Sequence, residues 1–505
     1  MADGGGAVTR LSMDSLATHS PSGVQLPPAR ELAAETGILH LGIGAFHRAH
    51  QAVFTEDAAV LAQEPGWGIC GVTQRSSTVA DHLRPQDGLY GVLERGLDDP
   101  ALRVVGQVRE AIVAAEETHR LMERFAEPAV RVVTLTVTEK GYRRGLGGGL
   151  NLTDPVVQAD LAGSTGAGGA ARSTVGQLVR GIQARSHLSG APLSILCCDN
   201  LTDNGEVLRA LVTDFCAALP SAEGDPLGQW IEANVSFPSS MVDRIVPATT
   251  DADRADARRL LGLTDEALVV AEPFRQWVIE DDFRAGRPSW ERAGADLVDS
   301  VRPFEQAKLR VLNCTHSLLA YLGALRGHES IADAVADPDL EHAARQLIAV
   351  DVLPTLTQPP GLDLTAYGQE VMQRFANPAL RHRTLQVAMD GSQKLPMRLL
   401  GTIRDRLAAG ETPHWAGLTL AGWMVFVATG RDRSGRTLPL EDPLADRLRA
   451  AVAGAESADG IVDGLLGVEE VFGPDLRDSA ELRAALVDSV SRLLTEQRSA
   501  EGGSA

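Results

Sequence analysis

Short apolar runs alternate with amphipathic stretches through the first half of the chain. The runs at 38–41, 68–72, 131–137 and 193–198 predict four strands, because each is short and the third is rich in β-branched residues. Between the last two runs, the pattern from Ser173 to about Ala184 predicts a helix that Ser173 or Thr174 caps. Strands that alternate with helices predict a parallel sheet covered on both faces.

Strand signals fade after about Ser300, and the remaining apolar positions follow a helical period. We therefore predict an α/β domain over residues 30–297 and a mainly α-helical domain over residues 298–495. Glycine-rich stretches at 145–149 and 163–169 predict a surface crossover, not a domain boundary. The segments before about Pro28 and after Ser499 are expected to be loose tails, and the first lacks the pattern of a signal peptide. The predicted helices of the second domain cover 305–325, 339–352, 395–409, 417–429 and 479–494.

Composition narrows the class of protein. The net charge of −20 argues against nucleic acid or an anionic membrane as the main partner, because both attract cationic surfaces. No apolar run is long enough to span a bilayer. The five cysteines show neither a disulfide framework nor metal-ligand spacing, which predicts a cytoplasmic protein without a metal site.

A glycine turn follows the first predicted strand. Gly42-Ile43-Gly44 comes directly after the apolar run and opens a predicted helix, a pattern typical of the phosphate-binding turn of Rossmann-type domains. The third glycine of that fingerprint is absent, so a strand-to-helix turn without a ligand stays open as an alternative. After the second predicted strand there is no acidic residue for a ribose. Arg75 lies there instead, facing either a 2′-phosphate of NADP or solvent.

The segment 304–317 carries candidate chemistry for alcohol oxidation. In one continuous α-helix, His316 would lie about 80° from Lys308 and about 60° from Asn313 around the axis, with Lys308 and Asn313 about 140° apart. A lysine can take the hydroxyl proton if desolvation lowers its pKa, and an amide can stabilise the partly charged oxygen. The alternative is a surface lysine, a capping asparagine and a core histidine.

Six motifs in order resemble the polyol-specific long-chain dehydrogenases, the family of mannitol dehydrogenase and fructuronate reductase. The resemblance extends from about Ile38 to beyond Arg398. Its motifs are Gly42–His50, Thr138–Tyr142, Cys198–Gly205, Phe237–Ile245, Glu272–Trp277 and Lys308-x4-Asn313-x2-His316.

The resemblance implies a role for several residues. It implies that Lys308 is the general base, that Asn200 and Asn313 polarise the reacting oxygen, and that Glu305 links the lysine to water. It also implies zinc-independent catalysis with NAD, or with NADP, and a monomer or weak oligomer. Asp243 and His316 are then substrate ligands, and the cofactor contacts come from Gly42, Ile43, Gly44, Ala45, Phe46, Thr138 and Glu139. No role is assigned to His47, Arg48 or His50.

The segment 382–398 bears on the substrate. Lys394 matches the family pattern Asp-Gly-Ser-x-Lys, whereas Gln386 stands where mannitol 2-dehydrogenases tend to carry arginine. The sequence of this segment is closer to that of the fructuronate reductases. Lys394, Arg383 and Arg398 are therefore candidates to bind a substrate carboxylate. Alternatively, the arginines only brace the helical domain.

We expect D-fructuronate reduction to D-mannonate, a reaction of a small sugar acid. The alternatives are mannitol 2-dehydrogenase, mannitol-1-phosphate 5-dehydrogenase, and a catalytically silent NAD(P)-binding protein.

Overall fold

The chain forms two compact units, Met1–Arg302 and Pro303–Ala505. The computed structural model describes residues 9–19, 21–27, 34–97, 99–145, 147–163 and 171–502. Most of the predicted glycine-rich crossover at 163–169 lies outside the described residues. In the described ranges, no helix combines the length and apolar character needed to cross a bilayer.

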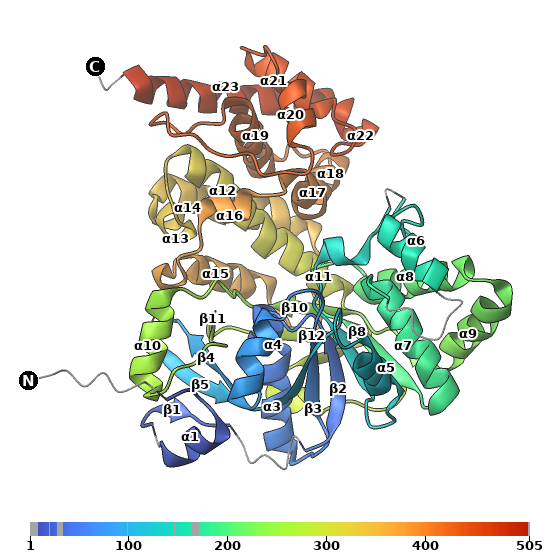
Figure 1. Ribbon diagram of the computed structural model, residues 1–505. Coiled ribbons are helices and arrows are strands. Elements are labelled where there is room, and N and C mark those ends of the chain that lie inside the picture. Colours follow the sequence, from blue (N-terminus) through green and yellow to red (C-terminus); the bar gives the residue numbers. More distant parts are fainter. Residues whose placement is uncertain are drawn as a thin grey trace, which may run out of the picture. The chain divides into compact units, whose positions relative to one another are not determined.

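A six-stranded, fully parallel sheet forms the centre of the first unit (Figure 1). The four predicted strands are confirmed as four neighbouring members of this sheet, and with them the predicted fold class. In spatial order the strands are β6 (Val108–Val113), β3 (Gly68–Thr73), β2 (Thr36–Leu41), β7 (Val132–Leu135), β8 (Leu193–Cys197) and β9 (Val235–Ser236).

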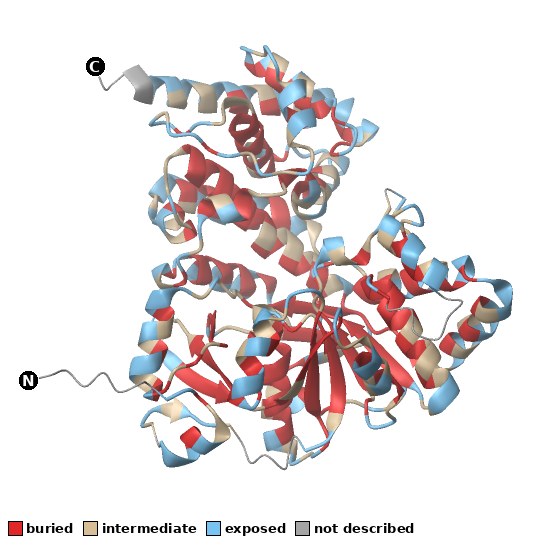
Figure 2. Cartoon of the chain, viewed as in Figure 1, coloured by how far each residue is buried: buried red, intermediate tan, exposed pale blue. Residues whose placement is uncertain are grey.

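Alternate residues of each strand enter different cores, which is why the strands read as continuous apolar runs. On β2, Ile38 packs into a cluster that contains Phe54, while its neighbour Leu39 packs into a cluster that contains Phe125 and Leu178. Figure 2 shows the strands of this sheet buried along most of their length. The helices of this unit are α1 (Met13–Thr18), α2 (Ala45–Ala49), α3 (Gln51–Ala62), α4 (Thr78–Leu83), α5 (Thr118–Ala126), α6 (Pro155–Ala162), α7 (Thr174–Leu188), α8 (Asn204–Ala218), α9 (Ser221–Asn234) and α10 (Asp251–Leu261).

Two smaller sheets complete the first unit. One has the order β1-β5-β4-β11, with β4 and β5 antiparallel, and the other has the order β10-β12-β13. Their strands are β1 (Val24–Gln25), β4 (Tyr90–Glu94), β5 (Ala101–Val105), β11 (Val269–Ala271), β10 (Ser240–Asp243), β12 (Gln276–Glu280) and β13 (Asp296–Val298).

The expectation of a loose N-terminal tail is wrong for the described residues before Pro28. Ser12 caps α1 in a capping box, and Leu11 and Leu16 are buried in a cluster with Leu102. Strand β1 then pairs in parallel with β5, placing Val24 opposite Leu102. Two buried leucines and a reciprocal cap are enough to order a helix of this length.

The described part of the second unit is built of helices. Helix α12 (Cys314–Leu325) is buried at every residue, and α19 (His414–Thr429) packs beside it. Helix α23 (Ala480–Gly502) extends past the predicted end at Leu494, so residues 499–502 are helical rather than loose. The other helices are α11 (Arg302–Ala307), α13 (Ile331–Ala336), α14 (Pro338–Gln346), α15 (Leu364–Phe375), α16 (Thr384–Ala388), α17 (Gly391–Leu395), α18 (Gly401–Ala408), α20 (Ala445–Ala451), α21 (Ala458–Leu466) and α22 (Pro474–Arg477).

Three of the predicted helices contain a π-helical turn that the sequence pattern does not reveal. These turns are η6 (Lys308–Asn313), η7 (Leu347–Val352) and η10 (Pro396–Leu400). A π-turn is rare and often marks a functional position.

Candidate active site

The glycine turn between β2 and α2 requires its first glycine. Gly42 has φ +98°, and a Cβ on it would lie 2.2 Å from the carbonyl oxygen of Thr136. A Cβ on Gly44 would meet nothing closer than the oxygen of Gly42 at 3.8 Å, so the backbone of Gly44 is open to close approach. One glycine makes the turn and the other leaves room, which fits the approach of a dinucleotide pyrophosphate. Ile43, Ala45 and Phe46, the other predicted contacts, belong to this turn and to the first residues of α2.

A buried histidine holds the turn in place. The Nε2 of His40 donates to the carbonyl of Gly42 at 3.1 Å, and its Nδ1 accepts from the hydroxyl of Thr134 at 2.7 Å. Thr136 also donates to the Gly42 carbonyl, at 2.8 Å. Burial lowers the pKa of His40 to about 3, so the ring is neutral and can play both parts.

His47, Arg48 and His50, which the sequence left without a role, lie in and just after α2, and the first two brace the same turn. His47 stacks on His40 with ring centroids 3.3 Å apart. Arg48 donates to the carbonyls of Gly44 and Ala267, and His50 bonds the carbonyl of Gln276 at 2.8 Å. Burial lowers the pKa of His50 to about 3 and that of His47 well below its usual range. All three side chains are buried within the first unit, where His47 and Arg48 support the turn and His50 ties the end of α2 to β12.

Three further cofactor candidates follow β3 and β7. Arg75 is exposed in the bend after β3, where the structure also shows no acidic residue before α4. Thr138 and Glu139 follow β7, and Thr138 has φ +70° and ψ 157°, a backbone conformation that residues other than glycine rarely adopt. The backbone N–H groups of Val137 and Thr138 donate to the carboxylate of Asp199 at 3.0 and 2.9 Å.

The first unit also contains two predicted substrate groups. Asn200 is exposed just beyond the end of β8, and Asp243 is the last residue of β10 and is buried. Asn200 follows the carboxyl end of a strand of the parallel sheet, the usual position of functional groups in open α/β sheets, whereas Asp243 ends a strand that pairs antiparallel with β12.

In the second unit, the predicted catalytic lysine lies at the start of the π-turn η6. Lys308 and Glu305 are buried, and Asn313 is half-buried at the end of the turn. The expected separation of about 140° between Lys308 and Asn313 is wrong, because it assumed α-helical geometry. A π-turn pairs residues five apart, which turns Asn313 towards the side of the helix that carries Lys308.

His316 lies one turn further along, in a cationic setting. It stacks on Phe375 at 4.6 Å and meets the edge of His382 at 4.7 Å between ring centroids. Burial lowers its pKa well below the usual range, and the positive charges of Arg398, Lys394 and Arg374 lower it further, as does His382. The Nε2 of His316 and the Nδ1 of His382 are buried without a hydrogen-bond partner among the described residues.

The three residues predicted to bind a substrate carboxylate lie in different surroundings. The ammonium of Lys394 bonds the carbonyl of Val387 at 3.3 Å, and Arg398 reaches the hydroxyl of Ser317, the residue after His316, at 3.4 Å. Arg383 is exposed at the N-terminus of α16. It is not among the charged residues that lower the pKa of His316.

Arg374 and His382 were missed by the sequence reasoning. Arg374 is buried on α15 beside Phe375. The sequence pattern that could have revealed it is a charged residue on the apolar face of the helix that Tyr367 and Val371 define.

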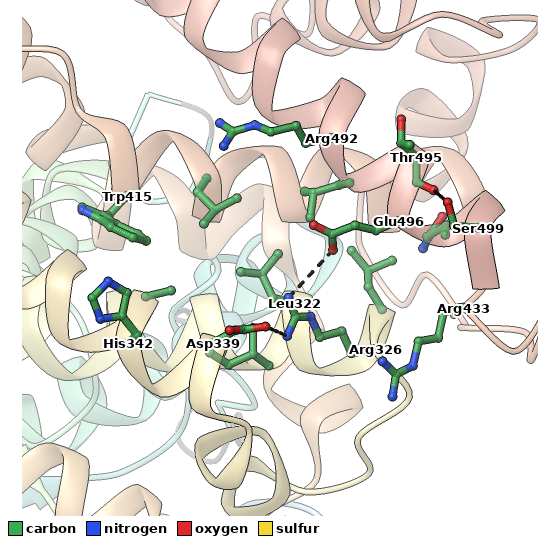
Figure 3. A pocket seen from close by; sticks show the side chains of 16 residues that line it. Leu322, Arg326, Asp339, His342, Trp415, Arg433, Arg492, Thr495, Glu496 and Ser499 are labelled. Carbon is green, nitrogen blue, oxygen red and sulfur yellow. Dashed lines mark hydrogen bonds and ion pairs between the residues drawn. The ribbon is translucent and has the colours of Figure 1, made fainter.

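A pocket of about 730 Å³ elsewhere in the second unit contains none of these candidates (Figure 3). Trp415 and His342 lie at one end of it and Arg433 lies towards the other. Arg326 is bound by Asp337, Asp339 and Glu496, so its charge is compensated. We therefore place no catalytic chemistry there.

Comparison with known proteins identifies the family of both parts of the chain. The family model of the mannitol dehydrogenase Rossmann domain matches residues 36–292, and that of the mannitol dehydrogenase C-terminal domain matches residues 300–494. The D-mannonate oxidoreductase of Escherichia coli (strain K12) is 40% identical over 464 residues, which cover 91% of this chain and 93% of that protein. The uncharacterized oxidoreductase YeiQ of the same organism is 42% identical, with 92% and 94% covered.

A solved structure matches nearly the whole chain. The ternary complex of Pseudomonas fluorescens mannitol 2-dehydrogenase with NAD and D-mannitol has a TM-score of 0.85 at 34% identity, covering 97% of this chain and 99% of that one. The fold and the glycine turn define an oxidoreductase with a Rossmann-type dinucleotide-binding domain. The chain belongs to the mannitol dehydrogenase family, as its motifs indicated.

The buried histidines around the glycine turn predict a loss of stability in acid. Their pKa values are near 6.5 when unfolded and are lowered to about 3 for His40 and His50, so the unfolded state binds more protons below pH 6.5. Their contribution to the free energy of unfolding is complete above about pH 6.5 and is lost as the pH falls towards 3. His47→Phe keeps a ring against His40 but removes one such group, and should flatten the pH dependence by up to about 1.4 kcal/mol per pH unit.

Urea unfolding at several pH values between 4 and 7 measures this slope. His119→Gln is the matched control, because His119 is largely exposed, and its slope should equal that of the wild type. A His47→Phe slope that is indistinguishable from the wild-type slope would contradict a neutral, buried His47.

Proposed function

We propose that this enzyme reduces D-fructuronate to D-mannonate with a nicotinamide dinucleotide. The observation that carries the proposal is the set of cationic side chains around the neutral His316 in the second unit, where two imidazole nitrogens have no partner among the residues that the structure describes. A uronate carboxylate suits such a setting, because charge-assisted hydrogen bonds to Lys or Arg are among the strongest that proteins make. D-Fructose has no charged group that would use these residues.

The position of Gln386 supports a uronate over a polyol. Mannitol 2-dehydrogenases tend to carry arginine at this position, whereas Gln386 is exposed on α16 and uncharged. The similarity to a D-mannonate oxidoreductase over more than nine-tenths of both chains agrees with this choice. Similarity to mannitol dehydrogenases at 34% identity makes fructose the competing substrate.

In the proposed mechanism each predicted residue has one task. The nicotinamide ring supplies the hydride when the cofactor is bound. Lys308 delivers a proton to the former carbonyl oxygen, and Glu305, buried one helical turn before it, returns a proton to the lysine from water. Asn313 and Asn200 donate to the same oxygen as charge develops on it.

The remaining groups hold the substrate and the cofactor. Asp243 accepts hydrogen bonds from substrate hydroxyls, and His316, held neutral by its surroundings, can both accept and donate. Lys394 binds the carboxylate, and Arg374 and Arg398 add positive charge near His316. On the first unit, the glycine turn and Thr138–Glu139 hold the cofactor.

We propose NAD as the cofactor, with NADP as the alternative. The Pseudomonas fluorescens relative was solved with NAD. The exposed Arg75 and the absence of an acidic residue in the bend after β3 favour acceptance of a 2′-phosphate as well. All five cysteines are buried and outside any disulfide, which agrees with a reducing cytoplasm, where we place the enzyme as a monomer or weak oligomer.

The function is tested by steady-state reduction of D-fructuronate and D-fructose, each with NADH and NADPH. We expect kcat/KM for D-fructuronate to exceed that for D-fructose by about two orders of magnitude, the size of one lost charge-assisted contact. Lys308→Ala should lower kcat by at least about a hundredfold in the same assay, the usual contribution of a general acid–base group. A preference for fructose would reject the uronate assignment, and turnover of neither substrate would favour a silent binding protein.

Lys394 should be the residue that distinguishes the two substrates. Lys394→Met keeps the length of the side chain and removes the charge, so kcat/KM for D-fructuronate should fall about tenfold or more while that for D-fructose changes little. Arg383→Met is the control, because Arg383 is exposed on the same segment and should leave both values near those of the wild type. Equal losses for both substrates in Lys394→Met, or a selective loss in Arg383→Met instead, would move the carboxylate subsite away from Lys394.

A further inference from the structure

Two buried polar side chains connect the carboxyl ends of β7 and β8 to the start of β10. Asp199 lies two residues beyond the end of β8, and Asn204 is the first residue of α8. Both belong to the motif at 198–205, from which only Asn200 has been given a task. Both are buried, Asn204 completely.

The carboxylate of Asp199 holds the segment that follows β7. It accepts the N–H groups of Val137 and Thr138 at 3.0 and 2.9 Å and the hydroxyl of Tyr142 at 2.6 Å. Thr138 keeps φ +70° and ψ 157°, a strained conformation for a non-glycine residue that persists only where its surroundings impose it. Asp199 supplies that constraint at the residue that precedes Glu139.

Asn204 joins the same carboxyl end to β10. Its side-chain N–H groups donate to the carbonyls of Asp199 and Ser240 at 3.0 and 2.7 Å, and its oxygen accepts the N–H of Ser240 at 3.0 Å. The hydroxyl of Ser240 in turn donates to the carbonyl of Cys197 at 2.7 Å. Residue 205, which follows Asn204, must be glycine, because a Cβ on Gly205 would lie 2.3 Å from the backbone oxygen of Phe237.

We propose that Asp199 and Asn204 are positioning residues that set the cofactor segment Thr138–Glu139, the catalytic amide Asn200 and the substrate ligand Asp243 relative to one another. The inference rests on the proposed function for the tasks of these residues. Asp199 is covalently next to Asn200, and Asn204 bonds the first residue of the strand that ends at Asp243. A fold could be held equally well by apolar contacts, whereas a strained backbone held by a charged group serves to place the groups it carries.

Asp199→Asn tests the first half of the inference. The variant keeps the size of the side chain but replaces one carboxylate oxygen with an NH2 group. That group faces at least one of the three groups that donate to Asp199, so hydrogen bonds to a charged acceptor are lost. We expect the Kd for NADH, measured by fluorescence titration, to rise about tenfold or more, and the amides of Val137 and Thr138 to exchange faster with deuterated solvent. If the wild type prefers NADPH, that cofactor is used.

Asp265→Asn is the matched control for a purely structural effect. Asp265 is buried in the same unit and also accepts three hydrogen bonds, two from the backbone of Gly91 and Ala267 at 2.6 and 2.9 Å and one from the side-chain amide of Gln86 at 2.8 Å. Its loss should lower the melting temperature comparably while leaving the Kd for NADH within about twofold of the wild type. Should Asp199→Asn fold poorly, Tyr142→Phe removes a single donor, and a smaller rise of about threefold in the same Kd is expected.

Asn204→Asp tests the second half. It preserves shape and the acceptor for Ser240 but places a carboxylate oxygen against two carbonyls. We expect kcat to fall and KM for D-fructuronate to rise, with the Kd for NADH within about threefold of the wild type. An unchanged kcat and KM in a folded Asn204→Asp would reject its positioning role.

The inference fails for Asp199 if Asp199→Asn and Asp265→Asn alter NADH binding equally, or if neither alters it. Binding and exchange are measured without the sugar. A wild type that binds NADH yet leaves D-fructuronate unreduced would therefore overturn the proposed function and leave the Asp199 result standing.

Discussion

The parallel pairing of β2, β3, β7 and β8 is the constraint on which the candidate chemistry of the first unit depends. Because these strands run in one direction, the segments that follow them emerge at one edge of the sheet. Register makes this exact to a residue: Leu41 lies opposite Val72 on one side and Leu135 on the other, and Leu135 lies opposite Cys197. The glycine turn, the strained segment after β7 and the amide after β8 therefore begin at the same level of the sheet. A buried hydrogen bond donated by His40 holds the glycine turn, and the carboxylate of Asp199 accepts the hydrogen bonds that hold the segment after β7.

Burial keeps a histidine neutral in each unit, and the neutral ring serves a different purpose in each. In the first unit, desolvation keeps the imidazole of His40 neutral, so it can receive one hydrogen bond and give another to the turn. In the second unit, the same effect keeps His316 neutral while fixed positive charges remain around it. A chain of net charge −20 repels anions at long range, but screening confines that repulsion to about a nanometre, within which a local cationic group decides.

The sequence was sufficient for the parallel strands, because a β-branched run buried on both faces has few other readings. It was insufficient for the π-turn at Lys308–Asn313, since one inserted residue in a buried helix leaves the apolar pattern nearly unchanged. The ordered N-terminal helix was missed because its stability comes from distant leucines, not from its own length. Arg374 was missed for a related reason: it reaches His316 through folding, from 58 positions along the chain.

Identification of the product tests the central claim most directly. D-Fructuronate would be reduced with NADH deuterated at the transferable position of the nicotinamide ring, and the product examined by nuclear magnetic resonance. We expect D-mannonate with one deuterium on the former carbonyl carbon, because hydride passes directly from the ring to that carbon while the proton on oxygen comes from Lys308. A product that lacks deuterium at that carbon, or the epimeric acid in place of D-mannonate, would contradict it.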